Sequence, residues 1–270
     1  MQKIHLTREK ETLLIPLYGK AKETQKGSPL IIDTKAVEMI KEIDYDFSAL
    51  NIPGKTNLLM CLRAKLIDNF TGEFLALNTG SLALHLGCGL DSRYQRIGNC
   101  DVEWFDIDFK EVIDLKRLFF RENVKYHLLA ASVTEAEWLT KIPAGKTQNI
   151  VIAEGLFMYL SPGDIKDLLT NLKARLGSYT LIFDAFSVYT AGKAGSHPSI
   201  KETGATIRWG IDDPEELTKW GIGIKFLAEK YFTANEELAN LDFSSRIIFK
   251  ILNFLPFIKK AQRLLIYRID

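Results

Sequence analysis

A glycine turn followed by acidic residues is the part of the sequence whose residue types and spacing could do chemistry. Residues 82–91 read LALHLGCGLD, an apolar run that ends in Gly87, Cys88 and Gly89. Glycine adopts a positive φ without strain and leaves the backbone bare, so that a ligand can approach it closely. Because many strand ends carry glycines for turning alone, this pattern by itself indicates no particular ligand.

The next apolar run supplies the second half of the pattern. It ends in Asp106, Ile107 and Asp108, and Asp108 comes nineteen residues after Gly89. An acid about 20 residues after such a turn accepts hydrogen bonds from a ribose in Rossmann-type folds. Side chains alternate along a strand, so Asp106 and Asp108 share a side and are both candidates. Capping of the next helix is the alternative role, and we assign ribose binding to Asp108 before Asp106.

The residues after Gly89 indicate which nucleoside the turn would hold. Leu90, Asp91, Ser92 and Arg93 follow, with no third glycine. A dinucleotide site uses that glycine to bring a helix N-terminus close to a pyrophosphate, and Asp91 would repel phosphate. The pattern therefore favours a nucleoside cofactor without phosphates, of which S-adenosylmethionine is the common one. An NAD-dependent oxidoreductase is the less favoured alternative.

Two more charged residues occur where a ligand would need them. Arg63 lies in a segment of helical periodicity among apolar neighbours, so its guanidinium needs a partner. That partner is either the carboxylate of a cofactor or Asp68, in a purely structural ion pair. Glu154 directly follows an apolar run, at the end of a strand where open α/β sheets bind ligands. The alternative for Glu154 is a hydrogen-bonded acid at a strand end.

The histidines and cysteines indicate no further site. His85 lies inside an apolar run and is predicted to be a core histidine that has its hydrogen bonds satisfied, not a catalytic base. Cys61, Cys88 and Cys100 are odd in number and contain no C-x-x-C pair. We expect neither disulfides nor a metal site, and a reducing compartment fits best.

Short apolar runs alternate with segments of helical periodicity and so position these residues. The runs are typical of buried strands, and the alternation predicts an α/β fold with a parallel sheet covered on both faces. The expected strands are Ser81 to Leu86, Val102 to Ile107, Val124 to Ala130, Asn149 to Ala153 and Tyr179 to Phe183. The expected helices between them are Phe109 to Arg121, Glu135 to Lys141 and Pro162 to Leu176. Thr134 and Ser161 are predicted to cap two of these helices.

One domain over 1–270 accommodates the whole pattern. A helical layer is expected over 1–75, from periodicity in Lys35 to Ile43 and Asn57 to Phe70. The cofactor-binding core follows over 76–190. Residues 191–270 are expected to form an insert after the fifth strand, with a mobile loop over 191–204, a helix over Pro214 to Trp220, and closing strands over 222–228 and 264–269.

The segment Ile247 to Leu265 mixes Phe, Leu and Ile with Lys and Arg, and two interpretations fit it. It could lie on a membrane surface, or its apolar stripe could pack in the core. Pro256 would interrupt a long interfacial helix, so we expect core packing.

Composition narrows the partners. The 35 Lys and Arg nearly balance the 34 Asp and Glu, which leaves a net charge of +1 and no field that favours nucleic acid or an anionic membrane. The first twenty residues lack the apolar region of a signal peptide, and no apolar run reaches eighteen residues. We therefore expect a cytoplasmic protein with a small-molecule acceptor, no nucleic-acid partner and no membrane partner; its oligomeric state is not predicted.

Taken together, several blocks resemble the leucine carboxyl methyltransferase family and its bacterial relatives of the tetracenomycin polyketide O-methyltransferase type. The blocks are Glu11 to Tyr18, Arg63 with Asp68, Leu86 to Arg93, Asp106 to Phe109, Glu111 to Ile113 and Ala153 to Leu160. The resemblance implies a class I methyltransferase that uses S-adenosylmethionine. Its fold would be a Rossmann-like, doubly wound, seven-stranded sheet that is parallel except for the last strand, with added helices over the active site.

The resemblance also implies roles for single residues. Arg63 would bind the carboxylate of the cofactor's methionine part, and the turn from Gly87 through Cys88 to Gly89, with Asp91 after it, would approach the cofactor. Asp108 would hold the ribose, and Glu154 would lie beside the ammonium and the transferred methyl, with Tyr159 as the second catalytic candidate.

The adenine end of the implied site departs from the usual pattern. Many members of the family have an Asp after the third strand, where this sequence has Ser132 followed by Val133. A serine hydroxyl can still form a hydrogen bond with the adenine amino group.

Methyl transfer from a sulfonium requires alignment and exclusion of water more than proton transfer. A carboxylate acceptor needs no base, so we expect a carboxylate or an acidic hydroxyl, on a polyketide-like small molecule or on a protein C-terminus. Packing is the alternative for each candidate lining residue of the acceptor pocket. The candidates are Tyr18, Tyr159, Tyr189, Arg208 and Trp209. A protein that binds the cofactor without catalysis is the competing hypothesis from another class.

Overall fold

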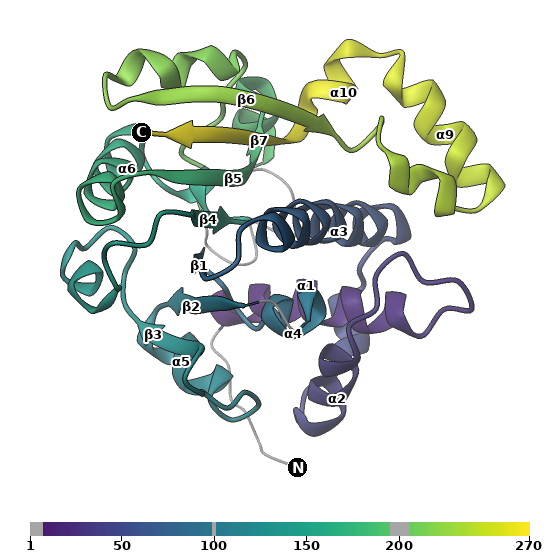
Figure 1. The fold of residues 1–270 in the computed structure, drawn as a ribbon. Helices are drawn as coiled ribbons and strands as arrows, with labels where there is room; N and C mark the ends of the chain where they lie inside the picture. Colours follow the sequence, from purple (N-terminus) through teal and green to yellow (C-terminus); the bar gives the residue numbers. More distant parts are fainter. Residues whose placement is uncertain (1–7, 99–100, 195–205) are drawn as a thin grey trace.

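The fold is described from a computed structural model of residues 8–98, 101–194 and 206–270 (Figure 1). His5, Cys100, His197 and most of the loop predicted over 191–204 lie outside the described residues. The side chains of residues 8–12, including Glu11 and Thr12, are likewise not described.

A seven-stranded sheet forms the centre of the molecule, in the order β3-β2-β1-β4-β5-β7-β6 (Figure 1). Strand β7 runs antiparallel to both of its neighbours, and the other paired strands are parallel. The predicted fold class is therefore confirmed. The strands are β1 Ser81–Leu86, β2 Val102–Asp108, β3 Tyr126–Ala130, β4 Asn149–Ala153, β5 Tyr179–Phe186, β6 Ile224–Tyr231 and β7 Gln262–Ile269.

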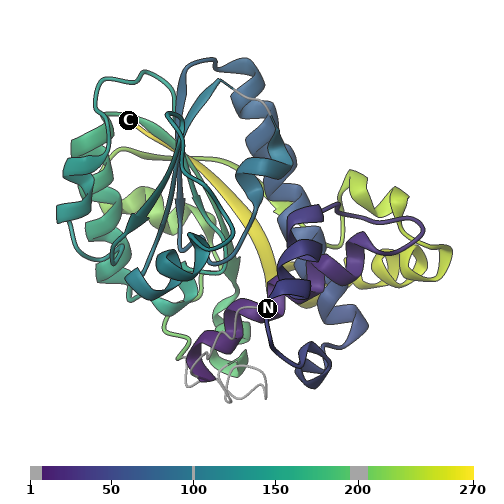
Figure 2. The same cartoon turned by 90° about the horizontal axis from the view of Figure 1, so that it is seen from below.

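Helices cover both faces of the sheet (Figure 2). Alternate residues of β1 belong to different cores, because side chains alternate along a strand: Ala83 packs with one core, Leu82 and Leu84 with the other. The first core includes α1 Arg8–Thr24, α2 Thr34–Glu42, α3 Gly54–Leu77, α4 Arg93–Ile97 and α5 Lys110–Lys116. The second includes η2 Glu137–Lys141, α6 Pro162–Leu176 and η4 Pro214–Trp220.

The strand order places a ligand crevice between β1 and β4. From β1 the chain continues to β2 and β3 on one side, and from β4 it continues to β5 on the other. At such a reversal the loops leave the sheet in opposite directions and open a crevice at the carboxyl ends of the strands. The glycine turn follows β1 and Glu154 follows β4, so the topology brings both to this crevice.

One of the two predicted helix caps is confirmed. Ser161 Oγ accepts a hydrogen bond from the Asp164 amide, and the Asp164 carboxylate accepts one from the Ser161 amide, which completes a capping box at the start of α6. The Thr134 cap is wrong. The segment forms only the short 3₁₀ helix η2, which begins at Glu137 without a side-chain cap, and the Thr134 hydroxyl instead contacts that of Ser132 at 2.8 Å.

Within the described residues, the helical layer predicted over 1–75 contains an α-helix, α1, besides the two segments whose periodicity indicated it. Helix α1 was not among the segments with predicted periodicity, and Pro16 lies inside it, although proline usually disrupts a helix interior. Residues Leu14 and Leu17 of α1 are fully or nearly fully buried, so packing of this face offsets the lost backbone hydrogen bond.

The chain makes two excursions after β5, where one insert was expected. The first contains α7 Val188–Ala194 and η4, and the second, between β6 and β7, contains η5 Glu236–Asn240, α9 Phe243–Asn253 and α10 Pro256–Ala261. The prediction that residues 247–265 pack in the core is wrong for α9 and α10. Phe249 is buried, but Ile251 is 58% and Phe254 is 83% exposed. In the part of the chain that the structure describes, no helix is long and apolar enough to cross a membrane.

Candidate functional site

The turn after β1 has the backbone geometry that only glycine adopts easily. The φ of Gly87 is +62° and that of Gly89 is +51°. A Cβ at Gly87 would come within 3.0 Å of Leu156 Cδ1, and one at Gly89 within 3.3 Å of Leu13 Cδ2. The positive φ disfavours other residues here and the leucine side chains leave little room for a Cβ, and the turn with Cys88 lines a cavity of about 1650 Å³.

Asp108 lies beside this turn, at the point where β2 ends. Its Oδ2 accepts a hydrogen bond from the Gly89 amide and its Oδ1 accepts one from the Phe109 amide, both at 2.8 Å. Burial raises the pKa of this carboxyl above its usual range, and the two amide bonds oppose that shift. Asp108 lines the cavity, and its orientation is fixed by the same turn that a cofactor would approach.

Asp106, the other predicted ribose ligand, does not lie at the cavity. Its carboxylate accepts hydrogen bonds from His85, Trp104 and Tyr126 and forms an ion pair with Lys116 at 2.8 Å. It lies two residues before Asp108, about 6–7 Å back along the strand. Its side chain therefore points to the same side of the sheet but is buried in the core. Burial alone would raise the pKa of Asp106, but Lys116 and His85 hold it well below its usual range. Its position supports a structural role.

Neither acid caps α5. The helix begins at Lys110, and its N-cap residue Phe109 makes no capping hydrogen bond through its side chain. The alternative that we kept for these acids is therefore excluded.

Arg63 and Glu154 meet at the end of β4. Arg63 Nε donates to Glu154 Oε1 at 2.8 Å, and Arg63 Nη1 donates to Asp184 Oδ2 at 3.1 Å. Arg63 and Glu154 both line the cavity. Asp68, the structural partner considered for Arg63, instead pairs with Arg93 and Arg96. Among the described residues, the two ion pairs of Arg63 use Nε and Nη1, which leaves Nη2 beside Gly155.

Glu154 is an ionised carboxylate held by two guanidinium groups. Its second oxygen pairs with Arg93 Nη2. Burial alone would raise the pKa of the Glu154 carboxyl, but Arg93 and Arg63 lower it to about 2. A group with this pKa is a poor base at neutral pH, so Glu154 can attract a cation or orient one, but it does not remove a proton.

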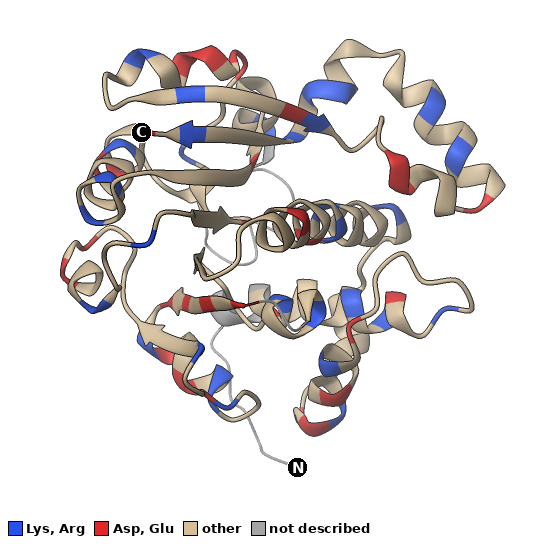
Figure 3. Ribbon diagram, in the orientation of Figure 1, with Lys and Arg blue, Asp and Glu red and all other residues tan. Residues whose placement is uncertain are grey.

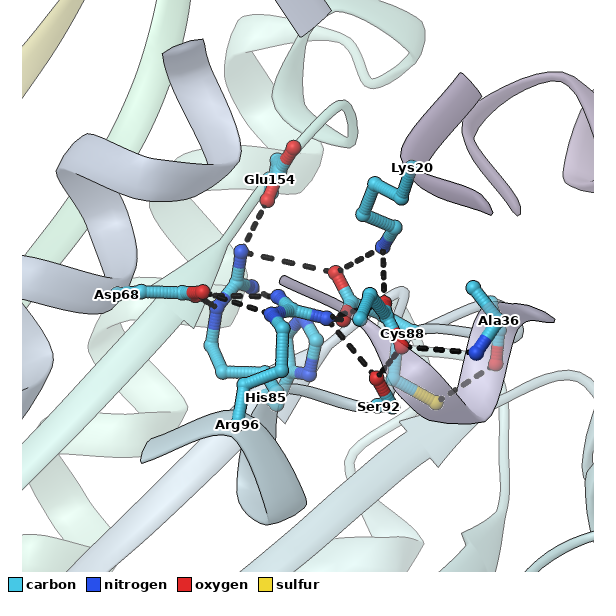
Figure 4. A network of polar contacts seen from close by, with 12 residues as sticks. Lys20, Ala36, Asp68, His85, Cys88, Ser92, Arg96 and Glu154 are labelled. Atoms are coloured by element: carbon cyan, nitrogen blue, oxygen red, sulfur yellow. Dashed lines mark hydrogen bonds and ion pairs between the residues drawn. The ribbon is translucent and has the colours of Figure 1, made fainter. Parts of the chain in front are cut away.

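A buried network of charges extends from Glu154 to the N-terminal helices (Figure 4). Arg96 pairs with Asp68 at 2.7 Å and with Asp91 at 2.5 Å, and Lys20 of α1 pairs with Asp91 at 2.9 Å. Burial alone would raise the pKa of Asp91, but Arg96, Lys20 and Arg93 hold it well below its usual range. Asp91 lines the cavity, and α1 and α3 are tied to the glycine turn through it.

His85 links this network to Asp106, as a core histidine with both ring nitrogens in use. Its Nε2 lies 2.9 Å from Arg93 Nη1 and its Nδ1 lies 3.1 Å from Asp106 Oδ1. Because arginine only donates, Nε2 accepts and Nδ1 carries the proton that Asp106 accepts. Burial lowers the pKa of His85, which keeps the ring neutral. The sequence-based assignment of His85 as a satisfied core histidine is confirmed.

The network around the cavity carries one more formal negative charge than positive. Its carboxylates are Asp33, Asp68, Asp91, Glu154 and Asp184, and its cations are Lys20, Arg63, Arg93 and Arg96. The site therefore favours a ligand of net positive charge. No group of three or more His, Cys, Asp or Glu among the described residues is arranged to hold a metal ion.

The predicted adenine residues line the cavity. Ser132 and Val133 follow β3, and the Ser132 hydroxyl contacts Thr134. Phe109, which directly follows Asp108, is 59% exposed and lines the same cavity. An exposed aromatic ring in a concave site offers a stacking surface for a base.

The cavity also has apolar lining residues from several segments of the chain. Its lining includes Ile52, Met60, Met158 and Phe186, together with Tyr159. Burial raises the pKa of the Tyr159 phenol, so this group stays protonated at neutral pH. The whole cavity exceeds the roughly 300–1000 Å³ of a typical single-ligand pocket, which leaves room for a second ligand.

Two of the five residues proposed for the acceptor pocket line the cavity, namely Tyr159 and Arg208. The other three pack elsewhere. Tyr18 stacks on Phe47 in the helical layer, Trp209 lies in the core against Phe183, and Tyr189 contacts Phe257 on the surface. These three side chains therefore pack against other residues, which was the alternative considered for each of them.

The sequence analysis missed several members of the charged network. Asp184 follows the predicted strand over 179–183, which is the same signal that identified Glu154, and it accepts hydrogen bonds from Arg63, Gly155 and Gln262. Lys20, Asp33 and Arg96 had no such signal. They come from α1, the N-cap of α2 and α4, and only the packing of these helices brings them together.

Comparison with known proteins agrees with this geometry. The family model described as leucine carboxyl methyltransferase matches residues 15–173, more than half of the chain. The chain is 34% identical to the tetracenomycin polyketide synthesis O-methyltransferase TcmP of Streptomyces glaucescens, over 98% of each protein. It is 28% identical to the S-adenosyl-L-methionine-dependent methyltransferase dpfgK of Gibberella zeae, over 87% of this chain and 85% of that one.

Solved structures share the fold at low sequence identity. A DUF574 family protein from Streptomyces avermitilis superposes with a TM-score of 0.57 at 10% identity, over 98% of this chain and all of the other. A SAM-dependent methyltransferase from Anabaena variabilis superposes with a TM-score of 0.51 at 11% identity, over 77% of this chain and 85% of that one.

Proposed function

The chain belongs to the leucine carboxyl methyltransferase family, and from this we propose that it transfers the methyl group of S-adenosylmethionine to an oxygen atom of a carboxylate or an acidic hydroxyl. The chain is an S-adenosylmethionine-dependent methyltransferase. The acceptor that we propose is a small, largely apolar molecule. The observation that carries the proposal is the glycine turn with Asp108, which shares one cavity with Arg63 and Glu154.

The residues of the cavity fit the cofactor. A Cβ at Gly87 or Gly89 would obstruct the turn, and the Asp108 carboxylate beside it suits a ribose diol, which offers two donors. S-adenosylmethionine carries a sulfonium, an ammonium and a carboxylate, so its net charge of +1 matches the excess carboxylate of the network. When bound, it supplies an electrophilic methyl group on a positively charged sulfur.

In this proposal, each residue of the cavity named below has a specific role in binding the cofactor or the acceptor. Arg63 holds the cofactor carboxylate through Nη2 while Glu154 and Asp184 fix the guanidinium. Glu154 attracts the ammonium, because its carboxylate is ionised and close to the cavity. Ser132 binds the adenine amino group and Phe109 offers a face for the ring. Tyr159 stays protonated and donates a hydrogen bond that orients the acceptor.

The acceptor chemistry follows from the groups that line the cavity. His85 has both nitrogens engaged, Glu154 has a pKa of about 2, and the pKa of Tyr159 is raised, so none of these three suits the role of general base at neutral pH. An acceptor that is already ionised needs no base, and Arg208 beside the cavity supports an anionic one. The name of the relative TcmP supports oxygen as the receiving atom and a polyketide-like acceptor.

A transfer assay with methyl-labelled S-adenosylmethionine tests this proposal. The acceptors are aromatic carboxylic acids, phenols of low pKa, aliphatic alcohols, and a peptide with a free C-terminus. We expect label on the acids or acidic phenols, with an ester product that releases methanol in alkali and an ether product that does not. We expect the peptide to be a poor acceptor, because Ile52, Met60, Met158 and Phe186 give the cavity an apolar lining.

Two results would contradict the proposal. Label on nitrogen or carbon would show that oxygen is not the receiving atom. Cofactor binding without transfer to any acceptor of these classes would favour the alternative of a non-catalytic binding protein.

We propose the cytoplasm as the location, because a reducing compartment keeps the free thiols Cys61 and Cys88 reduced.

A further inference from the structure

Helix α9 exposes an apolar stripe to solvent. Phe243, Ile247, Ile251 and Phe254 follow one another at intervals of four, four and three residues, so they lie on one side of the helix. They are 70%, 42%, 58% and 83% exposed. Leu255 and Phe257, at the turn into α10, extend the same apolar surface. Exposed apolar patches of this kind mark interaction surfaces.

The side of α9 opposite the stripe already packs against the protein. Rotating the helix to bury the stripe would therefore expose that packed side. Phe249 projects opposite the stripe and is buried in the core beside the N-terminal helices. The preceding segment is held to α3, because Asn69 Nδ2 donates to Glu237 Oε1 at 2.6 Å. In both ribbon views, α9 lies at the edge of the molecule, away from the sheet (Figures 1 and 2).

All charged side chains of the same two helices are basic. Residues 243–261 contain Arg246, Lys250, Lys259 and Lys260 and no Asp or Glu, although the whole chain carries a net charge of only +1. Figure 3 shows this local excess of Lys and Arg on α9 and α10. Arg246 and Lys250 are three and seven residues after Phe243, on one flank of the apolar stripe. Long cationic side chains beside an apolar face can reach anionic groups at its rim.

Of the surfaces that could cover this patch, an anionic lipid bilayer matches both its properties. A two-fold contact with a second copy would bring the same cations together, and the nearest acid in sequence, the N-cap residue Asp242, already accepts hydrogen bonds from Ser244 and Ser245. We propose that α9 and α10 dock on the surface of a bilayer rich in anionic phospholipids. The apolar stripe enters the boundary between headgroups and acyl chains, and the cations contact the headgroup phosphates. This replaces the expectation of no membrane partner, which rested on the net charge of the whole chain, on the absence of a long apolar run and on the stripe being in the core.

The docking surface is continuous with the rim of the cavity. Phe257 of α10 contacts Tyr189 of α7 with ring centroids 4.8 Å apart, and Thr190 and Lys193 of α7 line the cavity. Gln262, the first residue of β7 after α10, lines it too. Docking would therefore bring the cavity near the bilayer, where apolar acceptors are concentrated. This consequence rests on the proposed function, whereas the docking itself does not.

Sedimentation with lipid vesicles tests the docking. The full chain is mixed with vesicles of phosphatidylcholine alone, or of phosphatidylcholine with about one third phosphatidylglycerol, at low and high salt. We expect at least about tenfold more bound protein on the anionic vesicles, and release by high salt. The combined change Ile247→Ser, Ile251→Ser and Phe254→Ser should abolish binding. The combined change Arg246→Gln, Lys250→Gln and Lys260→Gln should remove the preference for anionic vesicles.

The matched control is Lys41→Gln with Lys166→Gln and Lys219→Gln, three exposed lysines outside α9 and α10. It removes the same charge and should bind vesicles as the wild type does. Circular dichroism melts establish that each variant is folded. If the serine variant unfolds, the variant with Arg246→Gln, Lys250→Gln and Lys260→Gln still tests the proposal. Equal binding of the wild type to both vesicles, or loss of binding in the control, would overturn the proposal. So would a dimer in light scattering that the serine variant converts to a monomer, because a second copy would then cover the stripe.

Discussion

Arg63 is the residue whose hydrogen bonds give the most specific prediction of how the cofactor carboxylate is bound. Its Nε and Nη1 are held by Glu154 and Asp184, and we propose that its Nη2 binds the carboxylate of the ligand. Lysine has no fork of this kind, so Arg63→Lys cannot hold both acids and the ligand at once. We expect binding of S-adenosylhomocysteine to weaken by about 10- to 100-fold in calorimetry, equal to roughly 1.4–3 kcal/mol.

The comparison ligand for this variant is 5′-methylthioadenosine, which lacks the carboxylate and the ammonium. Its affinity should stay the same in Arg63→Lys, because Asp108 and the glycine turn are untouched. The matched control is Arg117→Lys, on the exposed side of the turn after α5. An equal loss for both ligands would mean that Arg63 acts through the fold and not on the carboxylate.

His85 makes stability depend on pH. Its pKa is lowered by burial in the native state from about 6.5 in the unfolded chain, so the native state binds fewer protons. The stability from the neutral ring is present above pH 6.5 and is lost as the pH falls below it. We expect the unfolding free energy to fall by up to about 1.4 kcal/mol per pH unit from this group as the pH falls below about 6.5. In denaturant titrations, His85→Gln should flatten this slope.

Glutamine is the suitable replacement because its Oε1 can still accept from Arg93. The control is His127→Gln, on β3 at the edge of the sheet, whose ring is half-buried. If His85→Gln keeps the wild-type slope, or if His127→Gln removes it, then another group is responsible.

At the scale of single residues, the sequence predicted positions at strand ends better than it predicted their partners. Glu154 and Asp108 were identified because a charge directly after an apolar run reaches the edge of a parallel sheet. Asp106 shares the side of the strand with Asp108, and alternation alone did not distinguish them. The difference is depth, and it depends on Lys116 and Tyr126, which come from α5 and β3.

The glycine turn is the element on which the site depends most. Gly89→Ala would add a Cβ at a φ of +51°, 3.3 Å from Leu13, at a cost of about 1–2 kcal/mol of stability. The same change would narrow the approach to the backbone. We expect a lower unfolding free energy together with at least about tenfold weaker binding of S-adenosylhomocysteine.

Gly145→Ala separates these two effects. Its φ is +82°, but nothing lies within 4 Å of the added Cβ, and it does not line the cavity. This variant should lose similar stability and bind the cofactor product normally. Parallel binding losses in the two variants would show that backbone strain alone, not the approach of a ligand, explains Gly89.

The strands were predicted more completely than the helices. Each apolar run became a strand, because a buried parallel strand needs a continuous apolar sequence and little else. Helix α1, which contains Pro16, was not predicted from periodicity, and its stability comes from the tertiary packing of buried Leu14 and Leu17. Helix α9 was expected in the core because periodicity identifies an apolar face without indicating what that face contacts.

At the scale of the whole molecule, the fold brings charges from distant segments into one network. Lys20 of α1 and Asp68 of α3 are joined to Asp91 and Arg93 of the glycine-turn region, so the N-terminal layer is tied to the cofactor crevice. No local pattern indicates such pairs, since each depends on how helices pack over the sheet. The fold class and the strand-end residues were therefore predictable, and the network was not.

The central claim is that this cavity binds S-adenosylmethionine with Asp108 at the ribose. Isothermal titration calorimetry with S-adenosylmethionine, S-adenosylhomocysteine and NAD, on the wild type, Asp108→Ala and the control Asp114→Ala on α5, tests it most directly. We predict binding of both sulfur compounds but not of NAD, a loss of at least about tenfold in Asp108→Ala, and no loss in Asp114→Ala. Binding of NAD alone, or S-adenosylhomocysteine binding that Asp108→Ala leaves unchanged, would contradict the account.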